Sequence, residues 1–106
     1  MYKVFSYGKE YDVTVTPKKY VSGGLALKMD CLDDEFGCMM PFATLTVNLK
    51  NNLPEDHAFV DVNNCPWAEE FIMENGLGEF AGRYGSSGFC SYPLYKFYLD
   101  KIGGKG

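Results

Sequence analysis

Residues Asn63–Gly78 read NNCPWAEEFIMENGLG and contain the one helix that the sequence predicts. Pro66 suits the first helical position, because a backbone N–H there would have no partner within the helix. Gly76 suits the left-handed position that commonly follows the last helical residue. The stretch therefore predicts a short helix over residues 66–75, which must pack against the rest of the protein to be stable.

The predicted helix has two different faces. Trp67 and Phe71 lie one turn apart and form an apolar stripe that is expected to pack on a sheet. Glu69, Glu70 and Glu74 lie on the remaining face, and the helix contains no basic residue. A solvated acidic face explains this pattern, and so does a surface that binds a basic partner, so both interpretations stay open.

The residues before the helix alternate between apolar and polar side chains and predict β-strands joined by short loops, which favours an antiparallel meander. Pro17 is expected to end a strand or lie on an edge, and Pro41 to mark a bulge or a break. The chain is therefore predicted to be α+β, with an antiparallel sheet of five or six strands and the 66–75 helix packed on one face. The predicted core consists of apolar residues from both parts: Val13, Val15, Leu25, Leu27, Leu45, Val47, Phe59, Trp67, Phe71, Ile72 and Phe97.

The length and composition fit one domain. The 106 residues are enough for a single hydrophobic core, and the hydrophobic fraction of 46% is that of an ordinary globular protein. Residues 1–102 are predicted to form this domain, and residues 103–106 a flexible tail. No apolar run reaches the roughly 18 residues of a membrane span, and the N-terminus lacks the apolar segment of a signal peptide. A cytoplasmic location is the resulting expectation.

The segment after the helix is rich in glycine and predicts a loop-rich crossing, followed by a strand in residues 94–102. Residues 82–88 lack the GxxxxGK[ST] pattern and the strand-to-helix step of a phosphate-binding loop, so they are interpreted as a flexible turn. Arg83, the only arginine, stands next to Tyr84. Since Arg and Tyr are common anchors of protein interfaces, this pair is a candidate recognition element.

The sequence contains no specific catalytic or metal-binding motif. The cysteines lack a CxxC pair and the paired spacings of a zinc site, and His57 is the single histidine. We expect no catalytic residue, no metal site and no cofactor, and we expect that the protein is not an enzyme. The four cysteines are expected to be reduced thiols, most of them buried: Cys31, Cys38, Cys65 and Cys90.

Acidic residues are concentrated in the second half of the chain. The formal net charge is −4, and residues 51–82 contain seven acidic residues and no lysine or arginine. Phosphate groups are bound chiefly by lysine and arginine, so a basic protein surface is a better partner for this region than nucleic acid. The predicted partner-binding residues are the acids of the helix and its flanks, with two residues of the glycine-rich loop: Asp61, Glu69, Glu70, Glu74, Glu79, Arg83 and Tyr84.

Three segments resemble the small proteins grouped as domain of unknown function 4313 (DUF4313). They are FATLTVNL (Phe42–Leu49), AFVDVNNCPWAEEFIMENGLG (Ala58–Gly78) and SSGFCSYPLYKF (Ser86–Phe97), so the resemblance covers roughly residues 40–100. Such proteins occur mainly on phages, plasmids and conjugative elements of Gram-positive and gut bacteria. The family carries no assigned activity or catalytic residues, so no site is transferred. The resemblance implies a mobile-element accessory protein, and short acidic proteins of that kind often bind and block a host defence enzyme.

Three functions are kept as hypotheses. The favoured one is a non-enzymatic protein whose acidic region binds a basic partner, such as a nucleic-acid-handling enzyme of host defence. The second is a structural or regulatory module that self-associates through an exposed strand edge or an aromatic patch. The third is a small nucleic-acid-binding protein that uses Arg83 and the lysines of the N-terminal strands: Lys3, Lys9, Lys18, Lys19 and Lys28.

Overall fold

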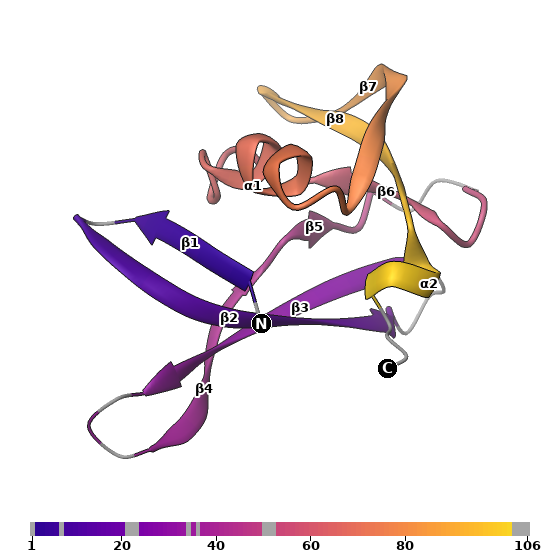
Figure 1. Cartoon of the computed structure of the whole chain (residues 1–106). Helices are drawn as coiled ribbons and strands as arrows, with labels where there is room; N and C mark the ends of the chain where they lie inside the picture. Colours follow the sequence, from indigo (N-terminus) through magenta and orange to yellow (C-terminus); the bar gives the residue numbers. More distant parts are fainter. Residues whose placement is uncertain are drawn as a thin grey trace.

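The computed structural model describes residues 2–6, 8–20, 24–33, 35, 37–49 and 53–102. The first half of the chain is a four-stranded antiparallel sheet in which neighbours in sequence are neighbours in space (Figure 1). The strands of this first sheet are β1 (Tyr2–Ser6), β2 (Lys9–Lys19), β3 (Leu25–Asp33) and β4 (Cys38–Thr44). The predicted meander is thereby confirmed.

The second half forms a separate four-stranded sheet, which corrects the prediction of a single sheet of five or six strands. The strands of this second sheet lie in the order β5-β6-β8-β7, and all neighbours are antiparallel. They are β5 (Thr46–Val47), β6 (His57–Val60), β7 (Gly78–Ser87) and β8 (Cys90–Phe97). The chain changes sheets at Leu45, between β4 and β5. Apolar and polar side chains alternate without interruption across this point, so the sequence carries no sign of the change.

The predicted helix is present but is shorter than residues 66–75. The helix α1 (Ala68–Glu74) begins after a turn that contains Pro66, and it has no side-chain cap. The first helical N–H donates to the carbonyl of Cys65 (2.9 Å). Pro66 therefore belongs to the turn and not to the first helical position.

α1 ends just before Gly76, as the sequence predicts. Gly76 has a φ of +61°, and its N–H donates to the carbonyl of Met73 (3.2 Å). The N–H of Leu77 donates to the carbonyl of Ile72 (2.9 Å). These two bonds form a Schellman motif, and they satisfy carbonyls that the helix itself leaves without a partner.

A second helix, α2 (Leu99–Ile102), stands where the sequence predicts the end of a strand, so that prediction is corrected. Lys101 on α2 donates from Nζ to the carbonyl of Asn75 (3.0 Å), just after α1. The last turn of α1 contains no basic residue of its own. Lys101 therefore supplies the positive charge that stabilises the C-terminal end of the α1 dipole.

The core lies between the two sheets and α1. All the predicted core residues are buried except Val47 and Trp67, which are half-buried. The predicted list omits several residues that are buried in the core: Val4, Val60, Leu77, Tyr95 and Ile102.

Both prolines of the first sheet lie where the sequence predicts an irregularity. Pro17 is paired with Leu27 of β3, while β1 pairs with β2 only as far as Val13, so Pro17 lies on a free edge. Pro41 is opposite Asp30, where the register of β3 and β4 shifts. The edge position and the bulge are confirmed.

Leu45 and Thr46 connect the two sheets. The Leu45 N–H donates to the Leu27 carbonyl of β3, and the Leu45 carbonyl accepts from the Asp61 N–H that follows β6, both at 2.9 Å. The buried Thr46 hydroxyl accepts from the Leu27 N–H (3.2 Å) and donates to the Leu25 carbonyl (3.4 Å). The Thr46 side chain thus replaces a backbone partner for β3 beyond the end of β4.

The glycine-rich segment after α1 is the strand β7, which corrects the predicted loop and flexible turn. It forms a hairpin with β8, and the register shifts between Phe80 and Tyr84. A Cβ atom at Gly85 would lie 2.6 Å from Cε1 of Phe59, so glycine is needed for this close approach. Gly82, inside the irregular part, has a φ of +88°.

The described residues contain no helix that is long and apolar enough to cross a membrane. The predicted tail, residues 103–106, lies outside the described residues.

Replacing Thr46 with valine is predicted to lower the free energy of unfolding by about 1–3 kcal/mol, because valine keeps the shape but leaves the Leu27 N–H without its acceptor. Urea denaturation followed by circular dichroism measures the change. Thr44→Val is the matched control, since Thr44 is exposed and its replacement should change stability by less than about 0.5 kcal/mol. Equal effects of the two substitutions would contradict the role given to Thr46.

Candidate partner-binding surface

Two of the predicted partner-binding residues, Glu69 on α1 and Tyr84 on β7, are linked through the buried Tyr95 and the ring of Phe80. Tyr95 of β8 is 2% exposed, and its hydroxyl donates to Oε1 of Glu69 on α1 (2.8 Å). The ring of Phe80 on β7 lies 5.9 Å from the ring of Tyr95 and 5.4 Å from the ring of Tyr84, centroid to centroid. Burial and the hydrogen bond to Glu69 raise the pKa of Tyr95, so its hydroxyl stays protonated and remains a donor.

Large apolar side chains are exposed on β7 and on α1. Phe80 is 43% exposed and Tyr84 is 64% exposed. Met73, one helical turn after Glu69, is 68% exposed, and Glu70 is exposed beside it. We call Glu69, Glu70, Met73, Phe80 and Tyr84 the α1–β7 surface.

The buried side of α1 fixes the position of this surface. Phe71 packs edge-on against Tyr2 of β1, with ring centroids 6.0 Å apart. The Glu69–Tyr95 hydrogen bond attaches α1 to β8. Figure 1 shows α1 between β1 and the β7–β8 hairpin. Because α1 contacts both sheets, its exposed residues are held in one orientation relative to β7.

The exposed side of α1 is acidic. Glu70 and Glu74 lie one turn apart and are both exposed. Like charges at this spacing cost an isolated helix about 0.2–0.5 kcal/mol. The two carboxylates therefore reduce the stability of α1 slightly while they present negative charge to solvent.

The two remaining predicted acids also stabilise local structure. Asp61 accepts hydrogen bonds from the backbone N–H (3.3 Å) and the side-chain amide (2.9 Å) of Asn64, and so fixes the turn before α1. Glu79, near the start of β7, accepts from the Tyr98 hydroxyl (2.6 Å), and this bond raises the pKa of Tyr98. Arg83 is exposed on β7.

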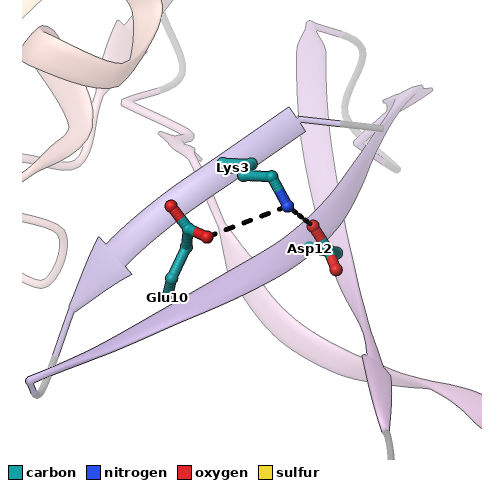
Figure 2. Close-up of polar contacts among 3 residues, drawn as sticks. All are labelled: Lys3, Glu10 and Asp12. Atoms are coloured by element: carbon teal, nitrogen blue, oxygen red, sulfur yellow. Dashed lines mark hydrogen bonds and ion pairs between the residues drawn. The ribbon is translucent and has the colours of Figure 1, made fainter.

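Lys3 and Lys28 of the first sheet lie on a face that also carries acids. Figure 2 shows Lys3 between Asp12, with which it forms an ion pair, and Glu10, whose Oε1 is 3.8 Å from the Lys3 Nζ. The hydrogen bond to Asp12 raises the pKa of Lys3. Lys28 and Asp30 are alternate residues of β3, so their side chains project from the same face of the sheet. Their partners on β2 lie two and four residues after Asp12, so the Asp12 side chain projects from this face as well. Phosphate-binding surfaces concentrate one sign of charge, so this face gives the nucleic-acid hypothesis no support.

The four cysteines and His57 are the candidates for covalent and metal chemistry. All four cysteines are free thiols, and burial, with a smaller effect of Asp61, raises the pKa of the Cys65 thiol to about 11. This thiol is neutral at pH 7 and therefore a poor nucleophile. His57 is the first residue of β6, and its Nδ1 lies 2.7 Å from the carboxylate of Asp56, whose pKa it lowers. Among the residues that the structure describes, no group of three or more His, Cys, Asp or Glu side chains is placed to hold a metal ion.

The comparisons with known proteins give one match. The model of the family described as domain of unknown function 4313 (DUF4313) matches residues 14–104. The match begins in β2 and therefore extends beyond residues 40–100, where the resemblance is visible in the sequence. It includes the whole α1–β7 surface. No curated protein and no solved structure matches the chain.

In the native protein at pH 7, Cys38 is predicted to react with N-ethylmaleimide much faster than Cys65. Cys38 is exposed, whereas Cys65 is buried and its raised pKa leaves almost no thiolate. Timed labelling followed by peptide mass spectrometry measures both rates, and labelling in urea provides the control in which they should become similar. Native labelling of Cys65 as fast as that of Cys38 would refute the prediction.

Proposed function

We propose that this chain, which belongs to the DUF4313 family, is a small acidic accessory protein of mobile genetic elements such as phages. It acts by protein–protein binding in the cytoplasm and not by catalysis. Its partner is a basic protein surface, and its effect is to inhibit a nucleic-acid-handling enzyme of host defence. The observation that carries this proposal is the α1–β7 surface, where the exposed rings of Phe80 and Tyr84 are linked through the buried Tyr95 to Glu69 of the acidic helix α1.

The apolar part of the α1–β7 surface has the composition of a binding site. Protein interfaces are enriched in Tyr, Phe and Met, and a few such residues supply most of the binding energy. Phe80 and Tyr84 contact each other, and Phe80 also rests on the buried ring of Tyr95. A partner would therefore meet rings that are already positioned, so little conformational entropy is lost on binding.

The exposed acids of α1, inside and next to the α1–β7 surface, indicate the sign of the partner's charge. Glu70 and Glu74 are exposed on α1, in a stretch, residues 51–82, that contains no lysine or arginine. Complementary charge speeds association and excludes partners of the wrong sign. A basic protein is thus the favoured partner.

The occurrence of such proteins on phages, plasmids and conjugative elements supports a host defence enzyme as the partner. Enzymes that bind nucleic acid carry basic surfaces that contact the phosphates. An acidic protein that covers such a surface competes with the nucleic acid. This mode of inhibition needs no active site in the inhibitor.

The combined substitution Glu70→Lys/Glu74→Lys is predicted to weaken partner binding at least about tenfold, or by about 1.4 kcal/mol. The melting temperature should change little, because both residues are exposed and a lysine at the C-terminal end of α1 suits its dipole. Glu69 is left unchanged because it accepts the hydrogen bond from Tyr95. The measurement is affinity capture of the tagged protein from a Gram-positive host lysate, quantified by mass spectrometry.

The matched control for this experiment is Glu55→Lys/Asp100→Lys. It makes the same change in net charge at two exposed positions outside the α1–β7 surface. A partner retained by the wild type and by this control, but lost from the α1 variant, would support the proposal. A partner that both variants retain would refute the acidic face as its binding site.

Self-association is a second candidate, supported by the free edge of β7. Pro93 of β8 is opposite Tyr84 and has no N–H, so this pair exchanges no hydrogen bonds between the strands. Such pairs alternate with bonded ones, so Ser86 is also a non-bonded position. The backbone N–H and C=O groups of Tyr84 and Ser86 therefore point away from β8, where another strand could pair with them.

Ser86→Pro tests this candidate. Proline removes only the outward N–H at this position and is tolerated on edge strands, so the fold should persist. If β7 pairs between copies, light scattering over a concentration series will show a dimer for the wild type and a monomer for the variant, with Ser86→Ala behaving as the wild type. A wild-type protein that stays monomeric at every concentration would eliminate self-association.

A further inference from the structure

A hollow of about 410 Å³ lies between the end of β4 and the turn that precedes α1. Its walls include Phe42 and Thr44 on one side and Asp61, Asn64 and Trp67 on the other. Among the residues that the structure describes, no basic residue lines it. The hollow therefore combines two aromatic rings with one carboxylate, a combination suited to an organic cation.

The aromatic walls are held by further rings. Phe42 and Trp67 have their centroids 5.7 Å apart. Trp67 packs at 89° against Phe71 (5.9 Å), and Phe42 packs against Tyr11 (5.0 Å). Both wall residues are only half-buried, so part of each ring is accessible to a ligand. This support keeps the rings in place when the hollow is empty.

The carboxylate of Asp61 is also held in place. The Asn64 backbone N–H and side-chain amide donate to its two oxygens. A carboxylate offers about four acceptor positions, so these two bonds leave capacity for a bidentate ligand. Asp61 is half-buried, which makes an added ionic hydrogen bond stronger than one at a fully exposed position.

We propose that this hollow binds an arginine side chain of a protein partner. The planar guanidinium stacks on the rings of Trp67 and Phe42 and donates two hydrogen bonds to Asp61. The proposal rests on the function proposed above in one respect, that the arginine comes from the basic partner. The hollow lies at the N-terminal end of α1, so a partner that covers the exposed side of this helix could reach both sites.

Other occupants fit the hollow less well. A lysine ammonium is compact and strongly hydrated, and it cannot stack or bind a carboxylate in a bidentate manner. A purely apolar side chain would remove water from Asp61 without replacing its hydrogen bonds. An anion would meet the charge of Asp61 with no basic residue among the wall residues to offset it.

Trp67 is the only tryptophan, so its fluorescence reports on this hollow directly. The probe is N-acetyl-arginine amide at constant ionic strength, and the matched control is N-acetyl-citrulline amide, which has nearly the same shape but no charge. We expect a saturable change of Trp67 emission with the arginine probe and no saturable change with the citrulline probe. An equal response to both probes, or no response to arginine, would overturn the proposal.

Asp61→Asn gives a second test. Asparagine keeps an oxygen that accepts the Asn64 N–H, so the turn should persist while the charge is lost. We expect at least a tenfold loss of affinity for N-acetyl-arginine amide, whereas Asp100→Asn, which makes the same change at an exposed acid outside the hollow, should leave the affinity unchanged. Full binding by Asp61→Asn would overturn the proposal.

The probe titration needs no partner, so its failure is separate from failure of the proposed function. A partner that depends on Glu70 and Glu74 but binds Asp61→Asn normally would leave the acidic face in place and refute the arginine site. Arginine binding in the titration together with a loss of the partner from Asp61→Asn would support both.

Discussion

The fold depends on the side chain of Thr46, which forms hydrogen bonds with β3 where β4 no longer pairs with that strand. β4 ends at Thr44, and β3 continues beyond it with backbone groups that need partners. The Thr46 hydroxyl and the Leu45 N–H supply them, and the Tyr20 hydroxyl donates to the Thr46 carbonyl (3.0 Å). Because these groups sit where the chain passes from one sheet to the other, the same bonds satisfy β3 and attach the second sheet to the first.

The connection between the two sheets also fixes the geometry of the candidate binding surface. α1 contacts the first sheet through Phe71 and Tyr2, and the second sheet through Glu69 and Tyr95. If the two sheets moved independently, α1 could not keep both contacts. The rigid junction therefore fixes the exposed side of α1 relative to Tyr84 on β7. Preorganisation of this kind would let a seven-residue helix with two repelling carboxylates, Glu70 and Glu74, serve as the recognition element of the proposed function.

The sequence predicts the elements whose signals are local, namely the meander, the helix and its end at Gly76, because alternation and glycine chemistry report them directly. It does not predict the second sheet, since the alternation through Leu45 is unbroken. The sequence also suggests a loop where the structure has β7. Gly85 is required because the Phe59 ring lies close to it, but in the sequence it cannot be distinguished from a loop glycine. In the candidate site, Glu69 and Tyr84 are found separately. Their link through Phe80 and Tyr95, and the exposure of Phe80, follow only from tertiary packing.

Native-state hydrogen exchange, measured residue by residue, tests whether the Thr46 junction joins the two sheets. If it does, the two sheets unfold as one cooperative unit. The amide of Leu27 in the junction, and amides in the middle of β3 and of β8, are then expected to exchange with one common free energy equal to that of global unfolding. Exchange of the β8 amides at a much lower free energy, while β3 stays protected, would show two independent sheets and contradict this expectation.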